Sequence, residues 1–120
     1  MIFDTTFLIE LARDKTVLKK FANVQLQTTQ ICAFEILVGA YRTNTVPQIS
    51  ALLEQFEILE LNSLALHHSA LLCAKALENG TPVGHSDCLI AGIAKAHNQN
   101  QIVTKNQSHF RNLGLKTLSY

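Results

Sequence analysis

Five short segments with strand character alternate along this chain with longer segments of helical periodicity. We expect strands at residues 1–4, 24–28, 57–61, 101–104 and 116–120. Strands that alternate with helices predict an α/β domain whose mostly parallel sheet is covered on both faces. The expected fold is therefore a three-layer α/β fold, with a central, mostly parallel five-stranded sheet flanked by helices.

The segments between these strands predict helices with recognisable ends. Thr5 or Thr6 can cap a helix that runs to about Asp14. Asn62 or Ser63 can cap a long helix, which is expected to end at the Asn-Gly pair of residues 79–80, a typical helix stop. Further helices are expected near residues 17–21 and 32–41, after residue 45, from residue 87 to about 98, and as a short turn at 108–111.

The composition indicates one folded domain that spans residues 1–120. Hydrophobic residues make up 48% of the chain and charged residues 16%, which excludes a disordered protein. The net charge of +1 argues neither for nor against a nucleic-acid partner. No apolar run approaches the roughly 20 residues of a membrane span. We see no signal peptide, and three widely spaced cysteines suit a reducing compartment, so we expect a cytoplasmic protein.

Three of the nine acidic residues lie in apolar surroundings: Asp4 in MIFD, Glu35 in ICAFEILV and Asp87 in HSDCLIAG. The other six lie among polar neighbours or at the ends of elements, where contact with solvent explains them. An ionised carboxylate is costly to bury without a partner, and the flanking segments supply no basic residue. These three acids therefore need a different explanation.

We expect the three carboxylates to converge at one edge of the sheet. The functional crevice of such folds lies beyond the carboxyl ends of the strands. Asp4 ends the first strand, Glu35 lies in the helix after the second, and the helix near Asp87 begins at the same edge because it runs antiparallel to the strands. Converging carboxylates repel one another unless a cation joins them, and Mg²⁺ prefers such oxygen ligands. A metal site of this kind can activate a water against a phosphodiester.

Simpler interpretations stay open for several residues. Asp4 and Asp87 could each serve only as a helix cap, worth about 0.3–1 kcal/mol, whereas Glu35 lies inside a helix and would cap nothing. His85 could line the crevice or have a structural role. A zinc site is not expected, because no His or Cys residues pair at the short spacings of zinc ligands.

Four segments make the chain resemble PIN domains, and most closely the VapC-type toxins of bacterial and archaeal toxin–antitoxin pairs. They are IFDTT, AFEILVGA, PVGHSDCLIAGIA and TKNQSHF, which occur in this order across nearly the whole chain. The resemblance implies a metal-dependent ribonuclease with Mg²⁺ or Mn²⁺ at the acidic cluster. Asp4, Glu35 and Asp87 match the three main acids of the family, so the resemblance makes them metal ligands and catalytic residues.

The resemblance extends to three further positions. Thr5 matches a hydroxyl position of the family, and Asn106 matches a polar position after the fourth strand. His109 stands where many relatives carry a fourth acid. Asn106 and His109 are therefore candidate catalytic residues beside the three acids. A histidine can bind a metal or contact a phosphate, but it does not repeat the charge of a carboxylate.

The resemblance also implies partners: an RNA substrate, a second copy of the chain in a homodimer, and a cognate antitoxin. The peptide tail of such an antitoxin typically lies in an apolar groove between the N-terminal helices. Two other hypotheses stay open. One is a PIN-fold module that binds RNA or protein but has lost catalysis through His109. The other is a receiver-like domain phosphorylated on Asp4 or Asp87 and assisted by Lys105, which leaves Glu35 unexplained.

Overall fold

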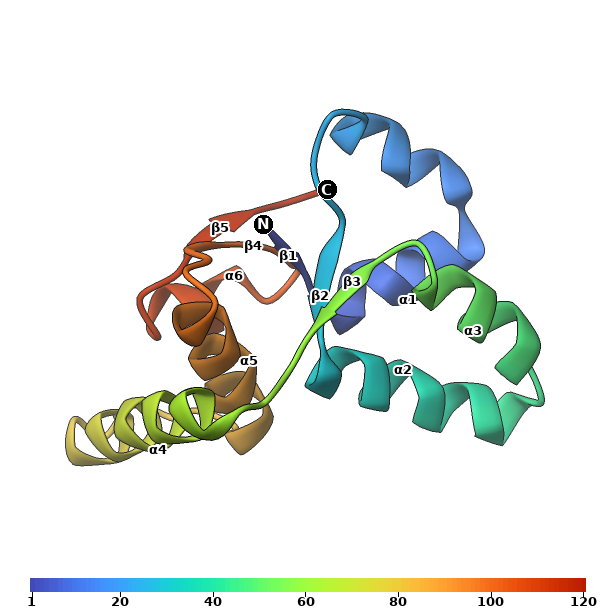
Figure 1. The fold of residues 1–120 in the computed structure, drawn as a ribbon. Helices are drawn as coiled ribbons and strands as arrows, with labels where there is room; N and C mark the ends of the chain where they lie inside the picture. The colour runs from blue at the N-terminus through green and yellow to red at the C-terminus, as the bar shows by residue number, and fades with distance from the viewer.

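The computed structural model describes all residues, 1–120, and contains one sheet in which every pair of neighbouring strands is parallel (Figure 1). The order across the sheet is β3-β2-β1-β4-β5. The predicted α/β fold with five strands is therefore confirmed. The strands are β1 (Ile2–Phe3), β2 (Gln27–Thr29), β3 (Glu57–Leu59), β4 (Gln101–Val103) and β5 (Lys116–Leu118).

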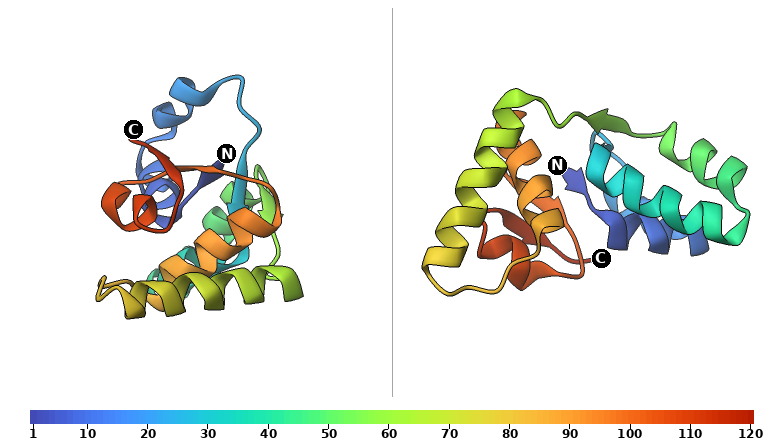
Figure 2. Two further views of the ribbon diagram at one scale, coloured as in Figure 1. Left: turned by 90° about the vertical axis from the view of Figure 1, so that its left-hand side faces the viewer. Right: turned by 90° about the horizontal axis from the view of Figure 1, so that it is seen from below.

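Helices cover the sheet from two sides. Figures 1 and 2 show α1, α2 and α3 on one side, and α4, α5 and α6 on the other. No helix combines the length and apolar character that crossing a membrane requires. The helices are α1 (Thr5–Arg13), the 3₁₀ helix η1 (Lys15–Phe21), α2 (Gln30–Thr43), α3 (Val46–Leu53), α4 (Ser63–Glu78), α5 (His85–Ala96) and α6 (Gln107–Arg111).

Several predicted boundaries differ from the observed ones by one to three residues, and a side-chain cap explains one of these differences. The second strand ends at Thr29, whose hydroxyl accepts a hydrogen bond from the Cys32 backbone N–H at 3.1 Å and so starts α2 at once. Helix α5 begins at His85, not after Asp87, with Gly84 at its cap position. Asp87 therefore lies in the first turn of α5 and does not cap it.

The inner strand β2, which lies between β3 and β1, is polar but buried, and its hydrogen bonds explain how the sheet tolerates it. The Thr28 hydroxyl donates to the Phe3 carbonyl at 2.7 Å. The Gln27 amide donates to Glu57 Oε1 at 2.7 Å. Buried polar groups are stable when each finds such a partner. The strand therefore joins β1 and β3 through side chains as well as through the backbone ladder.

The strand order places the switch point of the sheet, where such folds form their functional crevice, between the carboxyl ends of β1 and β4. From β1 the chain continues to β2, whereas from β4 it continues to β5 on the opposite side. Ligands in open α/β sheets bind where the winding direction changes in this way. Ile2 lies opposite Ile102, and Phe3 lies opposite Val103. The residues that follow these strands therefore begin side by side at the crevice.

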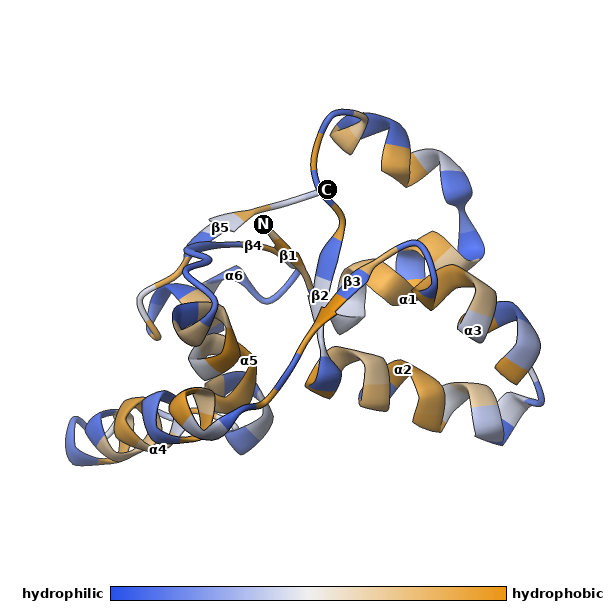
Figure 3. Cartoon of the chain, viewed as in Figure 1, coloured by the Kyte–Doolittle hydropathy of each residue, from blue (hydrophilic) through white to orange (hydrophobic).

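Aromatic packing anchors the N-terminal helices on the sheet. The ring centroids of Phe3 and Phe7 lie 4.7 Å apart, and those of Phe3 and Phe21 lie 5.1 Å apart. Figure 3 shows apolar residues along β1 and along α1, α2 and α3. Because Phe3 and Phe7 flank Asp4 in the sequence, this core holds the first acid in place.

Candidate active site

Asp4 joins the end of β1 to the start of α1 and is only 3% exposed. Its Oδ1 accepts hydrogen bonds from the Phe7 backbone N–H at 3.1 Å and from the Thr6 hydroxyl at 2.6 Å. Its Oδ2 accepts a hydrogen bond from the Thr104 hydroxyl at the end of β4. Burial raises the pKa of Asp4, and these hydroxyl hydrogen bonds oppose that rise. The helix-cap interpretation of Asp4 is confirmed, whereas the expected cap at Thr5 or Thr6 is wrong, because both lie inside α1. The Asp4 carboxylate also joins the ends of β1 and β4.

Glu35 lies in the interior of α2 and is half-buried. Its Oε1 accepts a hydrogen bond from the Thr5 hydroxyl at 2.6 Å, and its Oε2 accepts one from the Ser86 hydroxyl at 3.1 Å. Thr5 directly follows Asp4, and Ser86 directly precedes Asp87. The Glu35 carboxylate therefore lies between the two segments that carry the other acids.

Asp87 lies in the first turn of α5, where it faces α6. Its Oδ2 is 3.2 Å from Nδ1 of His109. Burial is the main cause of a raised pKa at Asp87; His109 opposes this rise, and the negative charge of Glu35 adds to it. The carboxyl groups of Asp87 in α5 and Glu35 in α2 therefore affect one another electrostatically.

The three predicted acids are linked through Glu35, whose hydrogen bonds reach Thr5 beside Asp4 and Ser86 beside Asp87. No three carboxylate, imidazole or thiol groups lie together as they would around a single bound ion. Asn106 is exposed just before α6, and its backbone N–H donates to the Thr104 hydroxyl at 2.9 Å.

His85, for which a place in the crevice or a structural role was expected, lies elsewhere. His85 is exposed and lines a separate cavity between α4 and α5.

No lysine or arginine forms an ion pair with the three acids. The ion pairs in the structure join Lys105 to Glu10 at 3.6 Å and His109 to Asp87 at 3.2 Å. Carboxylate and hydroxyl oxygens without a strong basic partner are the ligands that Mg²⁺ and Mn²⁺ prefer. The donor set at this edge therefore fits a divalent cation.

Three hydroxyl groups of the site were not predicted: those of Thr6, Ser86 and Thr104. Besides contacting Asp4, the Thr6 hydroxyl accepts a hydrogen bond from the Lys105 backbone N–H at 3.0 Å. Each of the three lies next to a predicted element end or acid in the sequence. This position in the sequence could have identified the three hydroxyl residues as part of the site. However, hydroxyl residues are so common at such ends that the position alone is not specific.

Comparison with known proteins assigns this arrangement to a family. The chain matches the sequence profile of the PIN domain over residues 1–115. It belongs to the PIN-domain family. The resemblance expected from the four sequence segments is therefore confirmed. No curated protein sequence matches this PIN domain significantly.

Solved structures share the fold of this PIN domain over nearly its whole length. VapBC-1 from nontypeable Haemophilus influenzae is 23% identical, with a TM-score of 0.85 over 99% of this chain and 98% of that one. DNA-bound VapBC from Salmonella typhimurium is 24% identical, with a TM-score of 0.84 over 98% and 96%. FitAB bound to a DNA fragment is 17% identical, with a TM-score of 0.81 over 99% and 94%.

The family and the strand order exclude the receiver-like hypothesis. Receiver domains have the strand order 2-1-3-4-5, with the first strand between the second and the third. Here β1 lies between β2 and β4. Glu35, which that hypothesis left unexplained, contacts the segments that carry Asp4 and Asp87 through Thr5 and Ser86.

Proposed function

We propose that this PIN domain is a metal-dependent endoribonuclease and the toxin of a toxin–antitoxin pair. The observation that carries the proposal is the position of Glu35, whose carboxylate bonds Thr5 beside Asp4 and Ser86 beside Asp87. None of these three acids forms an ion pair with a lysine or arginine. Membership of the PIN family and the likeness to VapBC structures support it.

In this proposal Glu35 and Asp87 hold a Mg²⁺ or Mn²⁺ ion, with Asp4 completing the acidic set. A divalent ion in such a site polarises a phosphodiester and activates a water as nucleophile. The hydroxyls of Thr5 and Ser86 orient Glu35, because each donates to a different carboxylate oxygen. Groups that hydrogen-bond to a metal-binding side chain in this way commonly hold it in the orientation that the metal requires.

The remaining polar groups act on the same edge. His109 holds one oxygen of Asp87, which leaves the other oxygen free of hydrogen bonds from protein groups. Asn106 is exposed beside the crevice and is available to contact the RNA backbone. Because the site lies between strand ends on one surface, we propose that a single-stranded RNA segment enters it.

Metal-dependent cleavage of RNA tests this proposal. The purified chain is expected to cut a labelled single-stranded RNA when Mn²⁺ or Mg²⁺ is added, because the carboxylates need the ion to act on a phosphodiester. Cutting should stop when EDTA removes the ion and return when the ion is restored in excess. Cleavage that continues unchanged in EDTA would contradict a metal mechanism.

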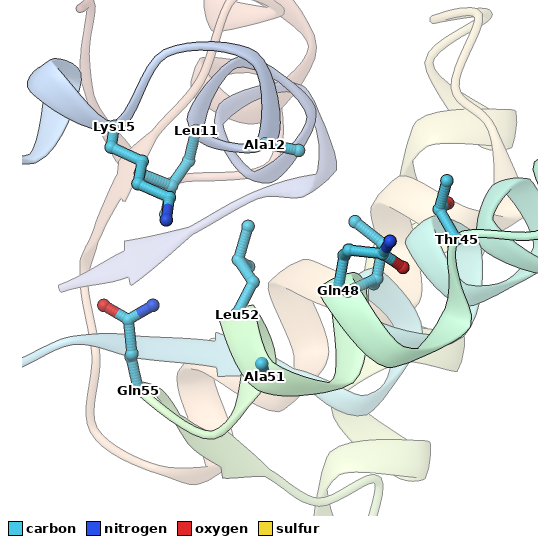
Figure 4. Close-up of a pocket in the computed structure, with 9 residues that line it drawn as sticks. Leu11, Ala12, Lys15, Thr45, Gln48, Ala51, Leu52 and Gln55 are labelled. Carbon is cyan, nitrogen blue, oxygen red and sulfur yellow. The ribbon is translucent and has the colours of Figure 1, made fainter.

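A cavity between the N-terminal helices supports an antitoxin as the protein partner. It measures about 680 Å³ and lies between the end of α1, η1 and α3 (Figure 4). The side chains that line it are mostly apolar, namely Leu11, Ala12, Ile49, Ala51 and Leu52, with Lys15, Thr45, Gln48 and Gln55 beside them. An amphipathic peptide from the antitoxin fits such a groove. We also propose that the toxin is a cytoplasmic homodimer.

Ala51→Arg is expected to weaken antitoxin binding. Ala51 is exposed and lines the cavity, so an arginine there adds bulk and a charge that the apolar lining cannot pair. We expect a loss of about tenfold or more in affinity, or about 1.4 kcal/mol. The measurement is calorimetry with the product of a small reading frame beside the gene. Ser50→Arg, on the same helix but outside the cavity, is the control; equal losses would contradict this location.

A second candidate function is a PIN-fold module that binds RNA or protein without cutting. The contact between His109 and Asp87 favours it, because an imidazole there occupies an oxygen that a metal could use. His109→Asp distinguishes the two functions. If the wild type is inactive, the variant is expected to gain RNA cleavage and tighter Mn²⁺ binding. If the wild type already cuts RNA, the binding-module hypothesis fails.

A further inference from the structure

Helices α4 and α5 lie side by side and run antiparallel (Figure 2). The line along which they touch, here called the seam, is unusually close at Gly92. A Cβ atom added to Gly92 would lie 1.9 Å from Ser69 Oγ and 2.7 Å from the Ala65 carbonyl oxygen. Ser69 and Gly92 are both buried. The backbones of the two helices therefore approach more closely here than side chains larger than glycine allow.

Two cysteines face each other one helical turn further along this seam. Cys73 follows Ser69 by four residues, and Cys88 precedes Gly92 by four residues. In an antiparallel pair, one turn forward on the first helix lies opposite one turn back on the second. Both thiols line the same cavity of about 240 Å³.

We propose that Cys73 and Cys88 are a redox pair that forms a reversible disulfide between α4 and α5 when the protein meets a small-molecule disulfide. A disulfide needs Cα atoms about 4.4–6.8 Å apart, so two helices must pack closely before one can join them. Helices α4 and α5 do so at Gly92. Both cysteines are reduced in this structure. The third, Cys32, is fully buried in α2 and takes no part.

The exposure of the two thiols sets the order of the reaction. Cys73 is partly exposed, whereas Cys88 is 2% exposed. The Cys73 sulfur attacks the small disulfide, forms a mixed disulfide and releases one small thiol. The Cys88 sulfur then attacks the Cys73 sulfur and releases the second small thiol. The two cysteine protons end on the two released thiols, so the protein loses two electrons and the small disulfide gains them.

The disulfide would join α4 to the turn of α5 that carries Asp87. Because Cys73 and Cys88 enclose a short loop, cross-linking them removes conformational freedom from the unfolded chain. We expect the midpoint of thermal unfolding to rise on the order of 5 °C in the oxidised protein. This inference does not depend on nuclease activity.

Mass spectrometry of the native protein tests the pair. The purified chain is incubated with oxidised glutathione, alkylated and digested without reduction. We expect a peptide that joins Cys73 to Cys88, a loss of two hydrogens from the intact chain, and Cys32 that is alkylated only after unfolding. Dithiothreitol should reverse the change. A Cys73–glutathione adduct as the end product, or a disulfide between two chains, would overturn the proposal.

Two variants keep the test decisive. Cys73→Ser should form no intramolecular disulfide, and its unfolding midpoint should not respond to the oxidant. Cys32→Ala is the matched control and should still form the Cys73–Cys88 peptide. If Cys73→Ser is too unstable to purify, the peptide map of the wild-type chain alone decides the question.

Discussion

Asp87→Asn is expected to lower RNA cleavage by about 100-fold or more, since even outer partners of metal ligands commonly contribute 10–100-fold. Asn has the shape of Asp87 but lacks the negative charge that would attract a divalent ion. Burial raises the pKa of Asp87, so the fold already disfavours its charged form. The variant should therefore fold at least as well as the wild type, and lost activity would report on the site alone.

The measurement is the initial rate of cleavage of a labelled RNA at saturating Mn²⁺, with thermal unfolding recorded in parallel. Glu78→Gln is a matched control, because this acid is exposed at the end of α4 and contacts no acid of the site. It should cut at the wild-type rate. Equal rates in Asp87→Asn and the wild type would show that the proposed site is wrong.

Gly92→Ala is expected to reduce the free energy of unfolding by about 3 kcal/mol, at the upper end of overpacking effects. The added methyl group would overlap the backbone of α4, with 2.6 Å to the Ser69 nitrogen and 2.7 Å to the Ala65 carbonyl oxygen. Backbone atoms cannot rotate away as a side chain does. The two helices would have to separate along the seam that holds α5 and Asp87.

Urea unfolding measures this effect, and Gly39→Ala is the matched control. Gly39 lies within α2, and a Cβ atom there would meet no atom within 4 Å. An alanine in a helix interior is favoured over glycine by about 0.5–1 kcal/mol, so this variant should be more stable than the wild type. Similar stabilities for the two variants would contradict the close seam between α4 and α5.

Local interactions explain why most elements could be predicted. Asn62 was expected to begin the long helix, and its side chain accepts a hydrogen bond from the Ala65 N–H at 2.8 Å. Gly80 was expected to end that helix, and it has a positive φ of 65°. Such caps involve residues three or four positions apart, so they can be predicted from the local sequence. The start of α5 was missed because Gly84 gives no side-chain cap signal.

The candidate acids could also be selected from the sequence, because a carboxylate among apolar neighbours is unusual. Their hydrogen bonds could not. The Thr104 hydroxyl reaches Asp4 across 100 residues, and the Ser86 hydroxyl reaches Glu35 across 51. These contacts depend on the order of strands and on how α2 meets α5, which no local pattern encodes.

The sequence by itself determined the alternation of strands and helices, the helix caps and the choice of Asp4, Glu35 and Asp87, because each depends on neighbouring residues. Only the tertiary structure decided which groups meet. It placed Glu35 against Thr5 and Ser86, placed His109 against Asp87, and brought Cys73 and Cys88 to one cavity. The reason is physical: parallel strands and antiparallel helices bring distant segments together through packing, and packing depends on the whole chain.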